Sequence, residues 1–534
     1  MEIRSWYPSQ ESTKEEEYLL KRLKRNKKLF AFLRENRHEL FDEEFQAELE
    51  LMYRDTGAGK EPVTPAMMAM AVLLQEYAGV SDAEAVELTV VDKRWQLVLG
   101  RLGETRPAFS QGAFWDFRAR LIRHDMDRRL LERTRELARK TKGFDWKKLP
   151  QQVRVAMDSS PLEGAGRVED TLNLLAHAAR KIVTCVANLL EVPFEQIATE
   201  AGVPLLLESS VKAGLDLRWE NPGAVNEALG QLVEQLDSLQ TWVEQELPDA
   251  AKQPPLHKHL QTLAAIRTQD LEPDPTDPGS PRIRQGTARD RRISIEDSEM
   301  RHGRKSQSYK FNGFKRHLAV DLDTGLILAC ALTAANRPEH EAAETLNDDI
   351  KRQNVAIDAL YIDRGYIASP VVQDVLARNG EIICRPWNVS NNNGRFSKAD
   401  FHIDVHDKLV TCPGDQTEPF EFGQTVTFDA QACAACSLRP RCTNARADRG
   451  RSLHIARDEK LQQHLRQQAS SSAGRQQLRE RVTVEHKLAH LAQRQGHRAR
   501  YLGTRKNLFA LRRAATIQNL EVIQRRHQGN RKAA

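Results

Sequence analysis

Residues 358–386, "DALYIDRGYIASPVVQDVLARNGEIICRP", carry in succession the signals of a strand, a helix and a second strand. The first apolar run ends at Asp363, which is followed by a basic residue, a glycine and a tyrosine. Ser369 and Pro370 are typical of the N-cap and first turn of a helix, and Gly380 is typical of the residue just beyond a helix end. Asp363 is either an ordinary turn residue or a carboxylate that the strand holds at a reaction centre, and this stretch agrees with both.

The segments before this stretch predict three more strands and another helix. "VRVAMD" is an apolar run that ends at Asp158, and "FKRHLAVD" and "LILACALTAAN", joined by "LDTG", predict a β-hairpin. "EHEAAETLNDDIKRQ" predicts the helix. When residues 165–290 are set aside, the order is β-β-β-α-β-α-β, which predicts an α/β fold with a mixed sheet flanked by helices. Sites in open α/β sheets form beyond the carboxyl ends of strands, so Asp158 and Asp363 are expected to converge there.

Two strand-end aspartates need a third acidic partner if they are to hold two divalent cations, which prefer oxygen ligands. The closing helix, "RERVTVEHKLAHLAQRQGHRARYLG", offers Glu480 and Glu485. On one helix these residues lie about 140° apart, so only one of them can face the site. We select Glu485, because apolar residues border its face and Arg481 precedes it by one turn on the same side.

The rest of the chain predicts helical and irregular segments outside this core. Residues 1–145 have helical periodicity and predict a small α-bundle, which either holds a helix-turn-helix or serves as a dimerisation domain. Residues 165–265 are helical again, and the prolines of "LEPDPTDPGSP" then predict a linker. The predicted domains are a helical DNA-binding or dimerisation domain at 1–145, a catalytic core at 150–164, 290–390 and 475–525, a helical insertion with its linker at 165–289, and a Cys-bearing insertion at 391–474.

Composition sets limits on the class of protein. The 534 residues are too many for one compact core, and 40% hydrophobic and 29% charged residues describe an ordinary globular protein. No apolar run reaches the roughly 18 residues of a membrane span, and the opening "MEIRSWYPSQESTKEEE" lacks the apolar core of a signal peptide. We therefore expect a cytoplasmic protein without membrane contact, whose seven cysteines are reduced.

The net charge of +6 is unevenly distributed. Residues 479–534 hold 14 Lys and Arg against three acids, and residues 282–317 hold 11 against four. Residues 191–252 instead carry 12 acids and three basic residues. The two basic blocks predict a track for a polyanion that is assembled in three dimensions, and the alternative is two independently solvated surfaces.

Several segments, in order along the chain, carry a resemblance to a known family. They are "AMDSSPLEGAGRVEDTLNLL", "SEMRHGRKSQSYKFNGFKRHLAVD", "TAANRPEHEAAETL", "YIDRGY" and "VEHKLAHLAQRQGHRARYLGTRKNLFALRRAATIQNL". From about residue 60 almost to its end, the chain resembles the DDE transposases of bacterial insertion sequences, which have an RNase H-like catalytic core.

The resemblance implies that Asp158, Asp363 and Glu485 are the acidic triad and bind Mg²⁺ or Mn²⁺. It implies cleavage of DNA strands at element ends and their transfer to target DNA. The expected partner is therefore double-stranded DNA, with the protein at the nucleoid as a homodimer or larger assembly. Two features depart from the family: the long acidic helical insertion, and Leu478, which stands where related enzymes often have a tyrosine.

Both basic blocks are expected to contact the DNA backbone, which positions DNA without reading its bases. The alternative for the first block is an ordinary charged loop and hairpin. The predicted DNA-contacting residues are Arg301, Arg304, Lys305, Lys315, Arg316, His317, Arg481, Arg498, Arg500, Tyr501, Arg505 and Lys506.

Four cysteines before the closing helix have the pattern C-x20-C-x2-C-x5-C. They are Cys412, Cys433, Cys436 and Cys442. Four thiols that include a C-x2-C knuckle fit a tetrahedral structural Zn²⁺ site, and the alternative is a reduced small subdomain with packed thiols. Cys185, Cys330 and Cys384 lie on apolar elements and are expected in the core.

Two hypotheses follow for the function. The first is an active transposase, and the second is a catalytically inactive, transposase-derived protein that holds element ends without cutting them. The intact Asp158, Asp363 and Glu485 favour the first, because drift would readily erase one of three. A zinc-dependent hydrolase is disfavoured, since no histidine-rich ligand set accompanies the thiols.

Overall fold

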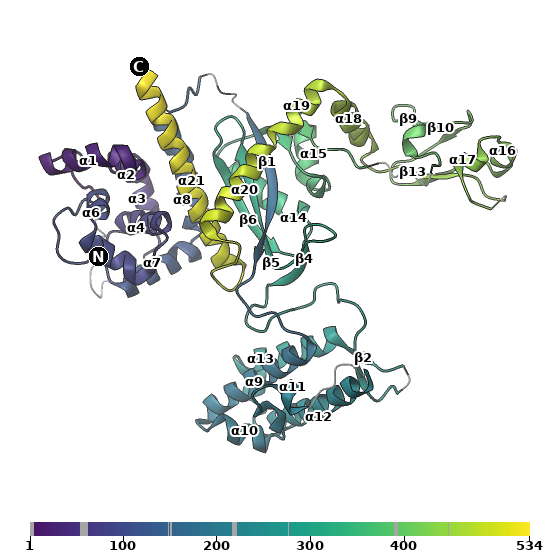
Figure 1. Cartoon of the computed structure of the whole chain (residues 1–534), viewed down its shortest axis with the longest axis horizontal. Coiled ribbons are helices and arrows are strands. Elements are labelled where there is room, and N and C mark those ends of the chain that lie inside the picture. The colour runs from purple at the N-terminus through teal and green to yellow at the C-terminus, as the bar shows by residue number, and fades with distance from the viewer. Residues whose placement is uncertain are drawn as a thin grey trace.

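A mixed sheet of six strands forms the centre of the computed structural model (Figure 1). Its strands are β1 (Val153–Glu163), β4 (Arg301–Arg304), β5 (Lys310–Asp321), β6 (Ile327–Ala334), β7 (Ile357–Tyr361) and β8 (Glu381–Ile383). The order is β4-β5-β1-β7-β8. β4 pairs with the start of β5, and β6 pairs with the rest of β5 on the same side. β1 is antiparallel to β5 and parallel to β7, which is parallel to β8. This mixed topology agrees with the predicted α/β class and is compatible with an RNase H-like core.

The structure describes residues 5–53, 62–141, 143–147, 149, 152–215, 222–275, 277–388, 394–446 and 448–533. Residues 150 and 391, where two of the predicted domain borders fall, lie outside these ranges. Within them, no helix is long and apolar enough to cross a membrane.

β1 is longer than its sequence indicates. We expected the strand to end at Asp158, but it continues to Glu163, so Asp158 lies in its middle. The second half of the strand pairs with β5, where Asp158 lies opposite Leu318. The residues "SSPLE" have a weak strand signal, and they are extended because their backbone groups pair with β5. β4, which the sequence did not predict, pairs with the first residues of β5.

Helices cover both faces of the sheet. The first face is covered by α14 (His340–Arg352), α15 (Pro370–Ala377) and α18 (Glu459–Ser470), and the second by α8 (Met126–Lys140), α20 (Val482–Gln495) and α21 (Thr504–Ala533). Val155 and Met157 of β1 lie in the core of the first face, and Ala156 lies in that of the second. Because side chains alternate along a strand, Asp158 faces the second side, toward α20.

The closing helical region is divided at Arg481. We expected Glu480 and Glu485 on one closing helix, but α19 (Ser472–Glu480) ends just before Arg481 and α20 begins just after it. Arg481 is at once the C-cap of α19 and the N-cap of α20. Glu480 and Glu485 therefore belong to different helices, and their relative direction does not follow from a spacing on one helix.

The N-terminal helices pack on the last helix of the chain. They are α1 (Lys14–Asn26), α2 (Lys28–Leu40), α3 (Glu43–Glu50), α4 (Pro65–Ala78), α5 (Asp82–Val91), α6 (Lys93–Leu99) and α7 (Gln111–Arg123), followed by α8. Ser81 and Ser110 cap α5 and α7 with their side chains. Phe509, Ile517 and Leu520 of α21 lie in the same apolar core as these helices, so distant parts of the chain share one interior.

A second group of helices follows β1. It consists of α9 (Thr171–Leu190), α10 (Phe194–Glu200), α11 (Val211–Gly214), α12 (Pro222–Glu246) and α13 (Leu256–Asp270). These helices share a core of their own and lie below the sheet in Figure 1. The proline-rich stretch that we expected to be a linker contains a short hairpin, β2 (Leu271–Pro273) with β3 (Pro281–Ile283).

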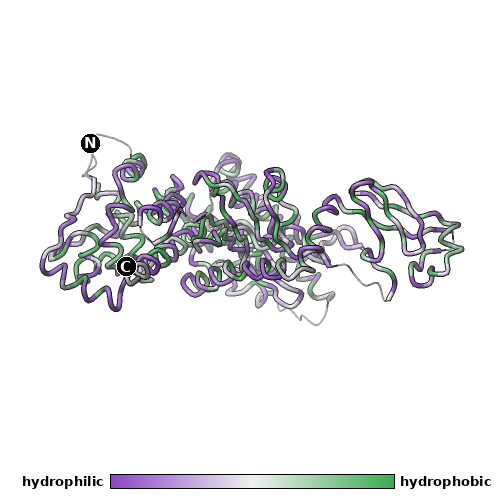
Figure 2. The backbone as a smooth tube through the Cα atoms, turned by 90° about the horizontal axis from the view of Figure 1, so that it is seen from above, coloured by the Kyte–Doolittle hydropathy of each residue, from purple (hydrophilic) through white to green (hydrophobic). Residues whose placement is uncertain are grey.

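Residues 394–455 form a small Cys-bearing unit. Its elements are β9 (His402–Asp404), β10 (Leu409–Thr411), β11 (Thr417–Pro419), β12 (Thr425–Thr427), α16 (Ala430–Ala435), α17 (Arg439–Cys442) and β13 (Ser452–His454). The unit lies at one end of the molecule in both Figure 1 and Figure 2. Its core is small and is centred on residues such as Phe401, Val410 and Phe428.

Candidate active site

The sheet register brings Asp158 and Asp363 together. β1 and β7 are parallel neighbours in which Ala156 lies opposite Tyr361, and each aspartate lies two residues further along its own segment. β7 ends at Tyr361, and Asp363 then caps the short helix η3 (Arg364–Tyr366) by accepting a 2.8 Å hydrogen bond from the next backbone N–H. The two carboxylates are therefore neighbours beside the point where β7 ends.

Arg481 lies between Asp158 and Glu485. Its guanidinium is 3.3 Å from Asp158 Oδ2 and 3.1 Å from Glu485 Oε1. Glu485 stands in the first turn of α20, with 48% of its side chain exposed. Glu480 instead contacts Arg154 at 2.6 Å. Of the two glutamates considered from the sequence, Glu485 is the one that an ion pair connects to Asp158.

Burial raises the pKa of Asp158 to about 6. The charges of Glu339 and Asp363 act in the same direction, whereas Arg481 and the Ser159 backbone N–H favour the charged form. A carboxyl group that is costly to ionise gains when a cation lies beside it. The surroundings of Asp158 therefore favour the binding of a cation.

Glu339 is an acidic residue of this centre that the sequence analysis missed. It directly precedes α14, and its Oε1 accepts a 2.5 Å hydrogen bond from Ser159 Oγ. The segment "TAANRPEHEAAETL", one of those that carry the family resemblance, contains this residue, but no role was assigned to the glutamate. A glutamate at the start of the helix that follows the hairpin is the signal that could have identified it.

Two of the predicted DNA-contacting residues are buried. Arg316 is 1% exposed and donates hydrogen bonds to the carbonyl oxygens of Pro161 and Gly496. His317 is fully buried, bonds to the Tyr366 hydroxyl at 2.7 Å, and has its pKa lowered by desolvation to about 3. These side chains hold the sheet and its neighbours together, so we remove both from the DNA-contacting set.

Other predicted DNA-contacting residues divide into bonded and exposed groups. Arg301 pairs with Asp290, Lys315 donates to the Arg337 carbonyl, Arg498 donates to the Gly164 carbonyl, and Arg505 pairs with Asp127. Arg304, Lys305, Arg500 and Lys506 are exposed, and Tyr501 is half-buried. Tyr309, in the turn between β4 and β5, is 47% exposed and is an aromatic residue that we had not singled out. The exposed cations remain the best candidates for phosphate contacts.

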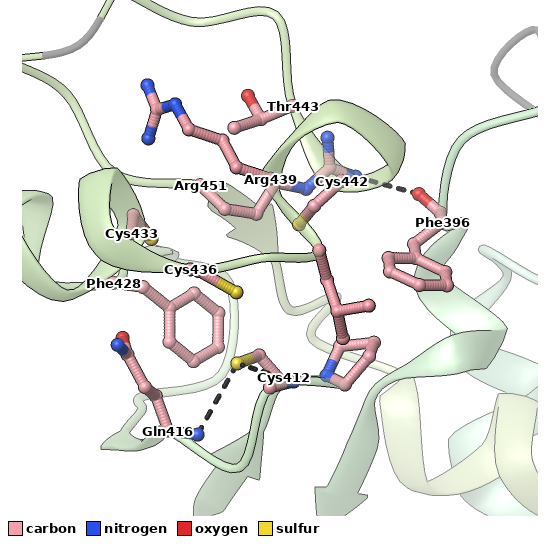
Figure 3. A pocket seen from close by; sticks show the side chains of 13 residues that line it. Phe396, Cys412, Gln416, Phe428, Cys433, Cys436, Arg439, Cys442, Thr443 and Arg451 are labelled. Atoms are coloured by element: carbon pink, nitrogen blue, oxygen red, sulfur yellow. Dashed lines mark hydrogen bonds between the residues drawn. The ribbon is translucent and has the colours of Figure 1, made fainter.

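Four thiols line one small cavity of the Cys-bearing unit (Figure 3). They are those of Cys412, Cys433, Cys436 and Cys442. The cavity, of about 20 Å³, has room for a single ion. Cys412 Sγ accepts 3.4 Å hydrogen bonds from the backbone N–H groups of Gly414 and Gln416.

The candidate metal ligands have the right chemistry for their ions, but their side chains do not yet point to a common centre. Across the described ranges, no group of three or more His, Cys, Asp or Glu side chains could hold a metal ion as it stands. The residue types nevertheless suit their ions, since Mg²⁺ prefers carboxylate oxygens and Zn²⁺ accepts four thiolates. Either site would require side chains to turn toward a common point. Cys185, Cys330 and Cys384 are buried, as expected.

Comparisons with protein families give two matches. Residues 284–520 match the family described as Transposase DDE domain, and residues 17–120 match the family described as Transposase domain (DUF772). Asp363 and Glu485 lie inside the first match, whereas Asp158 precedes it, because α9–α13 separate β1 from the other strands. Searches of curated proteins and of solved structures find no significant match.

The two matches together span well over half of the chain and define its class, a transposase. The chain belongs to the DDE transposases of insertion sequences. Members of this family act on DNA and generally use divalent metal ions, so DNA is the substrate that the family implies for this protein.

Proposed function

We propose that this transposase cleaves DNA strands at the ends of its insertion sequence and joins the freed ends to target DNA. Asp158, Asp363 and Glu485 would hold the Mg²⁺ or Mn²⁺ ions of this reaction. The observation that carries the proposal is the meeting of Asp158 with Asp363 in the sheet register and with Glu485 through Arg481. The catalytic core would be RNase H-like, with α9–α13 and the Cys-bearing unit as insertions.

Divalent cations bound at such a centre activate a water or a DNA 3′-OH and stabilise the leaving oxygen. The residues of the chain prepare the centre for this chemistry. Asp158 is held by β1 with 15% of its side chain exposed, so its charge is poorly screened by water. While no other cation is present, Arg481 neutralises Asp158 and Glu485. Once a cation takes its place beside these carboxylates, Arg481 is available to pair with a DNA phosphate.

The triad can be tested by amide substitutions. Asp158→Asn, Asp363→Asn and Glu485→Gln should each abolish cleavage of an element-end duplex in Mg²⁺ while DNA binding persists, because an amide keeps the shape of the ligand and loses its charge. Glu480→Gln is the matched control and should cleave at close to the normal rate. A triad variant that cleaves as well as the unmodified protein would show that its position is wrongly assigned. Binding without cleavage by the unmodified protein would instead identify a catalytically inactive DNA-binding protein.

The exposed cations would form the DNA-contacting surface. Arg304 and Lys305 belong to the first basic block, and Arg500 and Lys506 to the second. Tyr309 adds an aromatic side chain beside the first pair. Contacts of this kind hold the DNA backbone and give no preference for a base sequence.

Recognition of the element ends would lie in the N-terminal helices, which include the second family match. Removal of residues 1–145 is a poor test, because it would uncover the apolar side of α21. Trp115 of α7 is 61% exposed and offers a gentler change. Trp115→Ala should reduce the preference for an element end over an unrelated duplex, and an unchanged preference would show that this helix face does not read DNA.

The Cys-bearing unit would be held together by a structural Zn²⁺ ion on its four thiols. The convergence of the thiols on one cavity supports this, and so does the small size of the core, since binding of a structural zinc contributes folding energy. We expect about one zinc per chain in purified protein, lost together with the stability of the unit in Cys433→Ser. Cys185→Ser, at a cysteine buried in α9, is the control. A folded sample prepared without chelator that contains no zinc would rule out the site.

A further inference from the structure

Glu339 lies where three segments of the catalytic core meet. One of its carboxylate oxygens accepts a 2.5 Å hydrogen bond from Ser159 Oγ of β1. The other lies against Gly365 of η3, where a Cβ atom would stand 2.3 Å from Glu339 Oε2. Glu339 itself is the N-cap residue that directly precedes α14. The same carboxylate therefore contacts the strand, the turn and the helix.

The two contacts are adjacent to the two catalytic aspartates. Ser159 directly follows Asp158, and Gly365 comes two residues after Asp363. The charge of Glu339 is close enough to Asp158 to affect its ionisation more strongly than Asp363 does. One oxygen holds Ser159 by a hydrogen bond and the other packs against Gly365, so movement of Glu339 would disturb the neighbours of both aspartates.

The usual role of a glutamate at a helix start does not account for this arrangement. Glu339 is the N-cap residue of α14, but it has helical backbone angles and its side chain makes no capping hydrogen bond. Gly365 is not required by the backbone either, because its φ is not in the left-handed region. The glycine leaves room for the carboxylate, since a Cβ atom here would force the Glu339 side chain to move.

We propose that Glu339 is a positioning residue, which fixes the separation of Asp158 and Asp363 by holding Ser159 and by seating its carboxylate against Gly365. This inference rests on the proposed function, because it concerns the same acidic centre. It assigns to the "YIDRGY" glycine the purpose of admitting the carboxylate, and to Ser159 the purpose of orienting it.

The test compares variants that remove the hydrogen bond with one that retains it. Glu339→Ala and Ser159→Ala should each slow cleavage of an element-end duplex by roughly 100-fold, the cost of a displacement of about 1 Å at a reacting centre. The double variant should be no slower than the slower single variant, because the two residues act as one unit. Glu339→Gln can still accept the Ser159 hydrogen bond and should remain within about tenfold of the unmodified protein.

Gly365→Ala displaces the Glu339 carboxylate without changing Glu339 itself. In the unmodified background its Cβ would displace the carboxylate and slow cleavage, whereas in the Glu339→Ala background it should have little further effect. Glu344→Ala, at an exposed position of α14, is the matched control and should leave cleavage unchanged. If Glu339→Ala does not fold, Ser159→Ala and Gly365→Ala still decide the question.

A second readout does not depend on cleavage. Calorimetry should show that Mn²⁺ binds about tenfold more weakly to Glu339→Ala, because the spacing of the aspartates sets the affinity. Normal cleavage and Mn²⁺ affinity in Glu339→Ala, or effects of Glu339→Ala and Ser159→Ala that multiply in the double variant, would overturn the proposal. Asp158→Asn separates this failure from that of the proposed function: if it too binds Mn²⁺ and cleaves normally, the acidic centre itself is wrongly assigned.

Discussion

Arg512→Ala is expected to destabilise the protein strongly, because this arginine joins three parts of the chain. It lies on α21 with 4% of its side chain exposed, and it pairs with Asp125 at 2.6 Å, Asp127 at 3.3 Å and Asp349 at 3.2 Å. Asp125 is the N-cap of α8, Asp127 lies in the first turn of α8, and Asp349 lies in α14. Asp127 is fully buried and Asp349 nearly so, so both would lose a compensating charge without gaining water.

Removal of one partner from a buried ion pair costs about 3–5 kcal/mol. We place the effect of Arg512→Ala in this range, because Arg505 still pairs with Asp127 in the variant and offsets part of the loss. Guanidinium denaturation followed by tryptophan fluorescence measures the effect as a shift of the midpoint. A chain of several cores need not unfold in two states, so the midpoint of Arg512→Ala is compared with that of a control variant that unfolds by the same route. The control is Arg525→Ala, at an exposed arginine on the same helix. A loss below about 1 kcal/mol relative to this control would refute the reasoning, since that is the range of surface pairs.

Three further predictions concern charge and pH. Burial lowers the pKa of His317 to about 3, against 6.5 in an unfolded chain, so the stability that its neutral form contributes above pH 6.5 is lost as the pH falls. Denaturation should show a loss of about 2 kcal/mol in the free energy of unfolding between about pH 7.5 and 5. This loss should be absent in His317→Asn. Arg304→Ala and Lys506→Ala should each lower the slope of log affinity against log salt by about one on any duplex, and an unchanged slope would exclude a phosphate contact. Glu480→Gln weakens the partly exposed pair with Arg154 and keeps an oxygen that can accept the Tyr361 hydroxyl hydrogen bond, so a thermal melt should show a loss below about 1 kcal/mol.

The sequence predicted the order of the core elements, because that order is encoded in local signals. The hairpin, the helix after it and the strand-helix-strand stretch 358–386 all have clear periodicity, and Ser369 caps the helix of the last stretch. The length of β1 was not predictable in this way. "SSPLE" contains a proline and two serines, and only its pairing with β5, about 150 residues later, makes it a strand.

The candidate site was partly predictable for the same reason. The order of elements predicts that the strands carrying Asp158 and Asp363 lie in one sheet, and their parallel pairing brings the two aspartates together although Asp158 lies within β1 and not at its end. The burial of His317 did not, because it depends on helices that pack on the hairpin from elsewhere in the chain. Arg505 shows the limit most clearly, since its partner Asp127 lies 378 residues earlier and no local pattern connects the two.

The shared interior of the N-terminal helices and α21 has a consequence for how the protein is made. A ribosome releases the N-terminal helices long before it translates residues 504–533, so their apolar side stays uncovered until synthesis is nearly finished. A gene copy truncated within this last segment would yield a product with an incomplete bundle, prone to aggregation and degradation. Truncated copies of the gene would then yield little folded protein.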